Sequence, residues 1–181
     1  TEDGTVVDSI EGALPTCIDY LKDLGVNYVQ INPFYDFASI DETDTVNPQY
    51  NWGYDPKNYN VPEGSYSSNP YNGNVRIKEC KQMIQALHNA GIGVIMDVVY
   101  NHTYVLEGSA LARTVPKYYH RMSDAQNYYN GSGLGNCLST EKAMTSKYVV
   151  ESLKYWVEEY HIDGFRFDLM GALDCTTLNT A

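Results

Sequence analysis

Two charged residues near the C-terminal end of the sequence have types and a spacing that suit nucleophilic catalysis. Arg166 and Asp168 are two positions apart in a short apolar run. On a strand they would point to the same face, while Phe165, Phe167 and Leu169 would face a layer of helices. A guanidinium beside a carboxylate keeps it ionised at neutral pH, as a carboxylate nucleophile requires. The alternative is a salt bridge that only braces the interior, and an isolated Arg-x-Asp pair favours that alternative.

A second polar group lies between Asp97 and His102. Asp97 interrupts an almost wholly apolar run, where an unpaired carboxylate would be costly, so the sequence predicts a partner for it. Asn101 and His102 follow, and a neutral histidine and an asparagine can both donate hydrogen bonds to the hydroxyls of a ligand such as a sugar. Equally, Asp97 and His102 could only brace the loop, and this group alone does not decide between the two.

The segment Tyr50-Asn-Trp-Gly-Tyr-Asp-Pro56 places three aromatic residues within five positions. Gly53 and Pro56 predict a loop and not a periodic element. An aromatic face suits the apolar side of a pyranose ring, and the 17 tyrosines against 4 phenylalanines in the chain fit that use. The alternative is a small cluster of aromatics packed beneath the loop.

Three helix-then-strand units must position these groups. Each has apolar residues at helical spacing followed by a short apolar run. The helical stripes are Leu14, Ile18 and Leu21; Cys80, Ile84 and Leu87; and Val149, Leu153, Trp156 and Tyr160. The strands are predicted at 28–32, 93–99 and 164–169, and glycines at 25 and 91 are predicted to end the first two helices.

Apolar strands that alternate with helices predict an α/β fold with a parallel sheet, either doubly wound or a (β/α)8 barrel. No Gly-x-Gly-x-x-Gly and no phosphate-binding loop follows a strand, which removes the main support for a nucleotide-binding sheet. Polar residues cluster instead at the carboxyl ends of the strands, as in TIM barrels. We expect one domain over 1–181, a partial (β/α)8 TIM barrel (about the first half) with long insertions at about 35–74 and 103–140.

The composition excludes several classes of protein. Hydrophobic residues make up 43% and charged residues 19%, which fits a globular protein. The net charge of −11 argues against nucleic acid as a partner, and no run approaches the roughly 20 apolar residues of a membrane helix. The 4 cysteines have no CxxC spacing, so neither a zinc site nor a redox motif is predicted. Unpaired thiols favour a reducing, cytoplasmic compartment and leave secretion open.

Three motifs together resemble the α-amylase superfamily of glycoside hydrolases, and within it the type I pullulanases. Asp97-Val-Val-Tyr-Asn-His-Thr and Gly164-Phe-Arg-Phe-Asp-Leu-Met-Gly resemble its first two signature regions, and the segment from Tyr50 to Pro56 resembles the pullulanase heptapeptide. Further matches are Val29-Gln-Ile-Asn-Pro-Phe-Tyr-Asp-Phe-Ala-Ser, Thr114-Val-Pro-Lys-Tyr-Tyr-His-Arg and Gly131-Ser-Gly-Leu-Gly-Asn-Cys. The matches follow the family's order over nearly the whole chain.

The resemblance implies a debranching enzyme that hydrolyses α-1,6 linkages in pullulan, glycogen or limit dextrin with retention, and therefore an α-glucan as partner. It implies Asp168 as the nucleophile and Arg166 as its orienting partner. In such a mechanism one carboxylate attacks the anomeric carbon, and a second, about 5–5.5 Å away, acts as acid and then base. The resemblance also implies that the glucose at the cleavage site is bound by Tyr54, which stacks on it, and by Asp55, Trp52, Asp97, Asn101 and His102.

The chain departs from the family in its second carboxylate. The family's acid/base Glu follows the next strand and a His-Asp pair follows the seventh, whereas this sequence runs to Ala181 with only Asp174 after Asp168. General acid catalysis is worth about 10²–10⁴-fold, so we expect these residues alone to be inactive. Half a barrel would also expose strand edges and apolar surface, so we expect self-association.

Other functions stay open. A branching or transglycosylating enzyme would use the same nucleophile with an acceptor sugar in place of water, and a non-catalytic glucan-binding remnant would lack the Glu region. No cofactor is expected to be required. Asn101 matches a position that binds calcium in some relatives, but the sequence has no dense loop of oxygen ligands to support calcium binding here.

Overall fold

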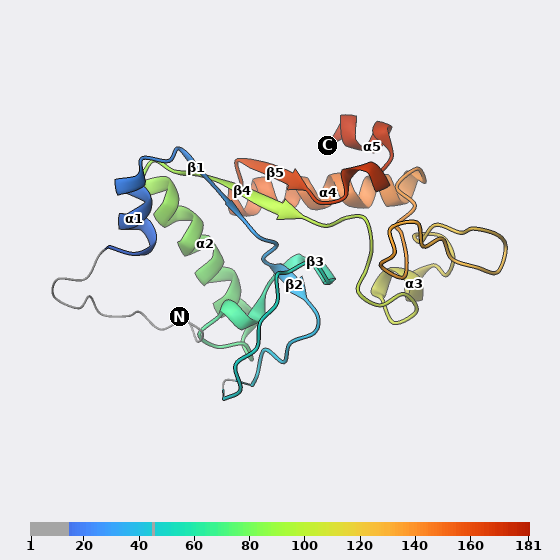
Figure 1. Cartoon of the computed structure of the whole chain (residues 1–181), viewed down its shortest axis with the longest axis horizontal. Helices are drawn as coiled ribbons and strands as arrows, with labels where there is room; N and C mark the ends of the chain where they lie inside the picture. Colours follow the sequence, from blue (N-terminus) through green and yellow to red (C-terminus); the bar gives the residue numbers. More distant parts are fainter. Residues whose placement is uncertain (1–14, 45) are drawn as a thin grey trace.

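A three-stranded parallel sheet lies at the centre of the computed structural model, which describes residues 15–44 and 46–181. Its strands β1 (Tyr28–Ile31), β4 (Gly93–Val98) and β5 (Gly164–Phe167) lie side by side in chain order (Figure 1). α2 (Gly73–Asn89) connects β1 to β4, and α4 (Ala143–Tyr160) connects β4 to β5. Parallel neighbours in chain order, joined by helices, are the arrangement of a (β/α) barrel, and the predicted partial barrel is confirmed.

The first two helices end close to the predicted glycines. α1 (Cys17–Leu24) stops at Gly25, whose φ of 74° lets its N–H donate to the carbonyls of Leu21 and Lys22 at 3.2 and 3.0 Å. α2 ends with Ala90 as its C-cap, one residue before the second predicted glycine. Of the first helical stripe, Leu14 lies outside the described residues, and Ile18 and Leu21 pack against the core.

One face of the sheet is buried beneath the two connecting helices. The β4 residues on that face, which alternate along the strand, pack in one core with side chains of both helices: Val94, Met96 and Val98 with Ile84, Leu87, Leu153 and Trp156. This apolar burial is the main favourable term in holding the helices on the sheet. The opposite face carries the polar side chains Gln30, Asp97 and Arg166, together with Ile95.

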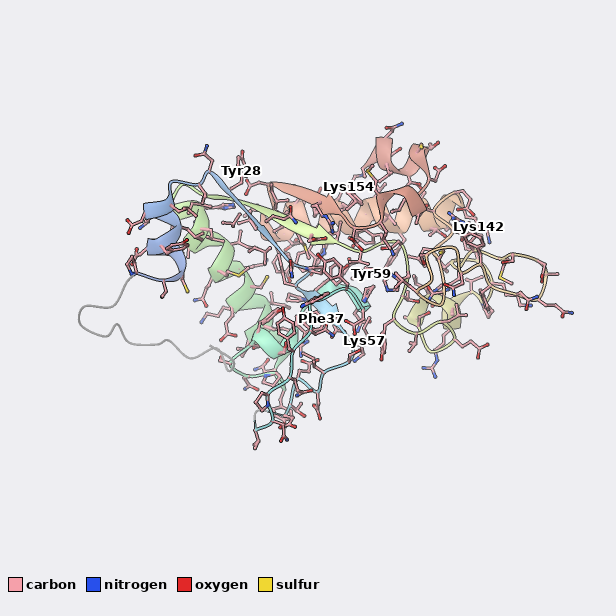
Figure 2. All side chains as sticks on the ribbon, in the orientation of Figure 1. Tyr28, Phe37, Lys57, Tyr59, Lys142 and Lys154 are labelled. Carbon is pink, nitrogen blue, oxygen red and sulfur yellow. The ribbon has the colours of Figure 1, made fainter. Side chains whose placement is uncertain are left out.

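The first insertion contains a second, smaller sheet in which β2 (Tyr35–Phe37) pairs antiparallel with β3 (Pro56–Pro62). Tyr59 of β3 lies near the middle of the molecule (Figure 2). It is buried, its ring stacks on Tyr100 with 5.1 Å between centroids, and its carbonyl accepts a hydrogen bond of 2.9 Å from the Trp156 indole. These contacts dock the insertion onto the barrel layer, which the local sequence pattern did not predict.

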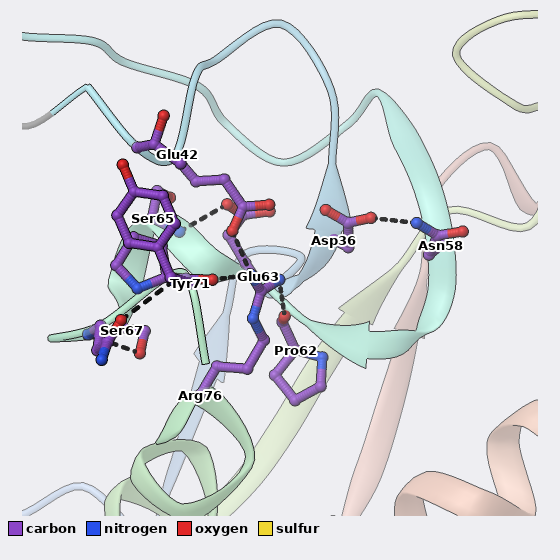
Figure 3. A network of polar contacts seen from close by, with 12 residues as sticks. Asp36, Glu42, Asn58, Pro62, Glu63, Ser65, Ser67, Tyr71 and Arg76 are labelled. Carbon is purple, nitrogen blue, oxygen red and sulfur yellow. Dashed lines mark hydrogen bonds and ion pairs between the residues drawn. The ribbon is translucent and has the colours of Figure 1, made fainter. Parts of the chain in front are cut away.

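A polar network holds the same insertion against the start of α2 (Figure 3). The buried Glu63 carboxylate accepts from the N–H groups of Phe37 and Ser65 at 2.9 and 2.8 Å, next to η1 (Gly64–Tyr66). Burial raises the pKa of Glu63. Arg76 of α2 pairs with Glu42 and donates to the carbonyl of Pro70 at 2.9 Å. Arg76 thus fixes the insertion to α2, and Glu63 holds two segments of the insertion together.

The second insertion lies beyond the carboxyl end of β4, where Figure 1 shows α3 (Ala110–Thr114) and the long loop after it. After β5 the chain forms η2 (Met170–Ala172) and α5 (Cys175–Thr180). The Asp174 carboxylate caps α5 by accepting from Thr177 N–H at 3.0 Å. None of the helices within residues 15–44 and 46–181 has the length and hydropathy that a membrane span requires.

Candidate active site

Asp97 is the acceptor around which the polar face of the sheet is organised. It is fully buried on β4, and its two carboxylate oxygens accept from Nη1 of Arg166 on β5 at 3.0 and 3.1 Å. The Tyr54 hydroxyl donates to Oδ2 at 2.8 Å, and Gln30 Nε2 of β1 lies 3.4 Å from the same atom. The predicted partner of Asp97 is therefore confirmed, and three strands or loops converge on it.

Arg166 joins this buried carboxylate to Asp168. The same Nη1 atom lies 3.0 Å from Asp168 Oδ1, and the side chain of Asp168 is 23% exposed whereas that of Asp97 is 1% exposed. The hydrogen bond with Asp97 raises the pKa of Arg166, so the guanidinium stays charged. Asp168 Oδ2 forms no hydrogen bond with any of the described residues. One oxygen is thus held and the other is free to react.

The backbone around Asp168 brings its carboxylate to the mouth of the sheet. Asp168 N–H donates to the Val98 carbonyl at 2.9 Å, which extends the pairing of β4 and β5 by one residue. The next residue, Leu169, has a φ of 46°, a left-handed conformation that costs an L side chain about 1–2 kcal/mol. The prediction that Leu169 faces the helix layer is wrong, because this turn leaves it 46% exposed, while Phe165 and Phe167 pack against the core as expected.

His102 lies in the turn after β4, with its ring against the neighbouring Asn101. Asn101 Nδ2 lies 2.9 Å from His102 Nδ1, and because an amide nitrogen only donates, the ring proton of the neutral imidazole lies on Nε2. Burial lowers the pKa of His102, although the charges of Asp168 and Asp55 and the backbone of Tyr54 act in the opposite direction.

The aromatic loop forms a shallow cavity of about 410 Å³, lined by Ser39, Tyr50, Asn51, Trp52, Tyr54 and Asp55. Trp52 is 63% exposed, so the loop presents aromatic surface and does not bury it beneath itself. Gly53 is required at the turn, because a Cβ there would lie 2.3 Å from the Pro33 carbonyl oxygen. Burial and the hydrogen bond to Asp97 raise the pKa of Tyr54 to about 12, so its phenol stays protonated at neutral pH.

The predicted site residues are not all brought into direct contact. Tyr54, Asp97, Arg166 and Asp168 form one hydrogen-bonded group. Asp55 and Trp52 line the cavity, and Asn51 Nδ2 donates to Asp55 at 3.0 Å. Sequence reasoning missed Gln30, although a polar residue between Val29 and Ile31 in an apolar strand could have indicated it.

The described residues offer little to a metal ion. Asn101 Oδ1 is buried without a hydrogen-bond partner, but a single amide oxygen does not make a calcium site. Across 15–44 and 46–181, no three His, Cys, Asp or Glu side chains gather in an arrangement that could hold a metal.

His120 in the second insertion makes stability depend on pH. It is fully buried with Nε2 2.9 Å from Thr103 Oγ1, and burial lowers its pKa to about 4. The pKa of histidine in an unfolded chain is about 6.5. Between that pH and the pKa of the folded protein, the unfolded state therefore binds a proton at His120 that the folded state does not. The free energy of unfolding should therefore fall by roughly 2 kcal/mol as the pH drops from about 6.5 to about 4.

Urea unfolding across that pH interval measures this contribution when the parent is compared with His120→Gln, whose side chain carries no charge. The variant should lose less stability on acidification than the parent. Equal pH slopes in the two proteins would contradict the expectation. A surface substitution at His161, which is exposed, is the matched control and should leave the slope as in the parent.

Comparison with known proteins agrees with this geometry. Residues 12–132 match the family described as the catalytic domain of alpha amylase. The pullulanase of Bacillus subtilis (strain 168) is 46% identical over 159 residues, which are 88% of this chain and 22% of that protein. The solved pullulanase of Paenibacillus barengoltzii, in complex with maltohexaose and α-cyclodextrin, is 50% identical with a TM-score of 0.90, covering 93% of this chain and 26% of that one.

A further solved structure, the pullulanase of Bacillus acidopullulyticus, is 53% identical with a TM-score of 0.87, covering 91% of this chain and 20% of that one. The chain thus spans about a fifth to a quarter of the length of these relatives. The match to the family extends over well more than half of the chain, from before α1 into the second insertion. Sequence match and barrel geometry agree, and the chain belongs to the family of α-amylase catalytic domains.

Proposed function

We propose that this chain is part of the catalytic barrel of a debranching glycoside hydrolase, which cleaves α-1,6-glucosidic linkages in pullulan, glycogen or limit dextrin with retention. The observation that carries the proposal is Asp168, with one oxygen held by Arg166 and the other free at the mouth of the sheet. This is the state that a carboxylate nucleophile needs before it attacks an anomeric carbon. The pullulanases to which the chain is similar support the choice of linkage.

Each neighbour has a role in this proposal. Asp168 Oδ2 forms the bond to the anomeric carbon, and Arg166 orients the carboxylate through Oδ1. Asp97 fixes Arg166 and Tyr54, and its burial under these donors makes it unsuitable as the acid that protonates the leaving oxygen. His102, neutral with Nε2–H, donates to a sugar hydroxyl.

An α-glucan is the proposed ligand. The relative from Paenibacillus barengoltzii was solved with maltohexaose and α-cyclodextrin, and the one from Bacillus subtilis with maltose. In this chain, Tyr54 would stack on the glucose at the cleavage site, while Trp52, Asp55 and Asn101 would complete the contacts. The role of 1–181 as one partial barrel domain, the inactivity of these residues alone and their self-association stay predictions.

Product analysis tests the linkage and the reaction type. The longest polypeptide that the gene encodes is incubated with pullulan, in which maltotriose units are joined by α-1,6 bonds, and separately with linear amylose plus a labelled acceptor glucan. We expect maltotriose from pullulan, with the α-anomer formed first, and no label in larger products. Transfer of amylose segments to the acceptor would instead support a branching enzyme, and binding without cleavage would support a glucan-binding remnant.

A further inference from the structure

Each residue of the turn that carries Asn101 and His102 forms a hydrogen bond with one of the two insertions or with α4. It follows the last residue of β4, so its backbone groups have no partners within the sheet. The partners are Tyr35 OH for Val99 N–H (2.6 Å), Ser152 Oγ for Tyr100 OH (2.7 Å), Leu138 N–H for the Asn101 carbonyl (2.8 Å), Tyr59 OH for the His102 carbonyl, and Asn136 for Thr103.

Asn136 makes the most complete of these contacts. Its Oδ1 accepts from Thr103 N–H at 3.0 Å, and its Nδ2 donates to the Thr103 carbonyl at 2.7 Å. A primary amide carries an acceptor and a donor side by side, so this side chain replaces the neighbouring strand that the turn lacks. Asn136 is 1% exposed and Thr103 is 2% exposed. Loss of the amide would leave two buried backbone groups of Thr103 unsatisfied.

The segment that carries Asn136 is itself held in place. Cys137 and Leu138 are buried, the Cys137 carbonyl accepts from Arg121 N–H at 2.7 Å, and Leu138 N–H donates to the Asn101 carbonyl. The second insertion therefore forms hydrogen bonds with the turn on both sides of His102. Leu138 bonds to Asn101 on the N-terminal side, and Asn136 bonds to Thr103 on the C-terminal side. Because both neighbours of His102 are held by hydrogen bonds, its backbone has little freedom to rotate, and the direction of its side chain is fixed.

We propose that Asn136 is a positioning residue, which holds the backbone at Thr103 so that His102 keeps its ring against Asn101. Its importance for catalysis rests on the function proposed above, but its effect on His102 does not. Asn136 touches neither carboxylate of the site and acts only through the turn. The long second insertion thereby contributes to the geometry of the site without lining it.

The imidazole of His102 reports directly on this positioning. The chain has 4 histidines, so ¹⁵N labelling of histidine gives few signals. The imidazole signal that disappears in His102→Gln is that of His102. In the parent chain at neutral pH we expect one dominant tautomer, with Nδ1 bare and Nε2 protonated. Asn136→Ala should abolish that dominance and give a mixture of the two tautomers, because the His102 ring can then move away from the Asn101 amide.

A matched control separates positioning from general damage to the insertion. Asn127 lies in the same insertion, is exposed, and donates to Asp124 Oδ2 at 2.8 Å without touching the turn. Asn127→Ala should keep the parent tautomer. A second test variant, Asn136→Asp, has nearly the same shape and keeps an acceptor for Thr103 N–H but sets an oxygen against the Thr103 carbonyl in place of the donor, so it should also give a mixture even if Asn136→Ala fails to fold.

The parent tautomer in a folded Asn136→Ala or Asn136→Asp protein would overturn the proposal, and so would a mixture in Asn127→Ala. Circular dichroism on each variant identifies those that are folded. A general loss of stability would lower the melting temperature without mixing the tautomers below it. The measurement uses no glucan, so a failure of the proposed hydrolase function would appear in the product analysis alone.

Discussion

Replacing Asp168 with asparagine is expected to lower kcat for glucan hydrolysis by about 10⁴-fold, in a catalytically active polypeptide that contains this chain. Asparagine has nearly the same shape and can still accept from Arg166 through Oδ1, so the site should keep its geometry. An amide is too weak a nucleophile to form the covalent intermediate of a retaining mechanism. Affinity for a maltooligosaccharide should therefore stay within about threefold of the parent value, measured by calorimetry.

The same chemical change at Asp174 provides the control. Asp174 follows the site closely in sequence, but its carboxylate caps α5, and asparagine is an equally good cap. Asp174→Asn should therefore retain both turnover and affinity. Retained turnover in Asp168→Asn would rule out the role of Asp168 as nucleophile, and loss of turnover in both variants would point to a general disturbance after β5.

The second large effect is expected at Asp97, whose replacement by asparagine should lower the free energy of unfolding by about 3 kcal/mol. The carboxylate is buried and accepts from Arg166 and Tyr54, with Gln30 Nε2 also close to it. Asparagine removes the charge that attracts the guanidinium and turns an NH₂ group towards other donors. Because Arg166 also orients Asp168, kcat should fall by about 10²-fold as well.

Urea unfolding followed by circular dichroism measures the change in stability. The control is Asp19→Asn, since Asp19 pairs with Lys22 at 3.7 Å on the surface, with a side chain that is 78% exposed. An exposed pair contributes little, so the control should change stability by less than about 0.5 kcal/mol. If the two variants were equally stable, the buried carboxylate would not organise the site as described.

Much of the site follows from local sequence. The spacing of Arg166 and Asp168 places both side chains on one face, because strand residues alternate, and the two form an ion pair at 3.0 Å. The interruption of an apolar run by Asp97 predicts a partner, since an unpaired buried carboxylate is too costly. Gly25 predicts the end of α1, because a left-handed cap favours glycine. These inferences need only the geometry of one element at a time.

The identity of the partners was decided by the tertiary structure. Arg166 meets Asp97 because β4 and β5 pair in the register Asp97 to Arg166, and that register is fixed by how α2 and α4 pack on the far side of the sheet. Gln30 joins them through the register of β1 with β4. Strands separated by tens of residues carry no local signal for their alignment, so spacing alone could not identify these contacts.

The insertions show the same division between local and distant information. The sequence by itself determined that Tyr50 to Pro56 forms an aromatic loop, and that Asn101 and His102 follow a strand. Only the folded chain decided that Tyr54 reaches Asp97, that Asn136 grips Thr103, and that Leu169 turns out of the helix layer. Local patterns record backbone preferences and alternation. Contacts between distant segments depend on packing and on satisfying buried polar groups, which only the assembled core establishes.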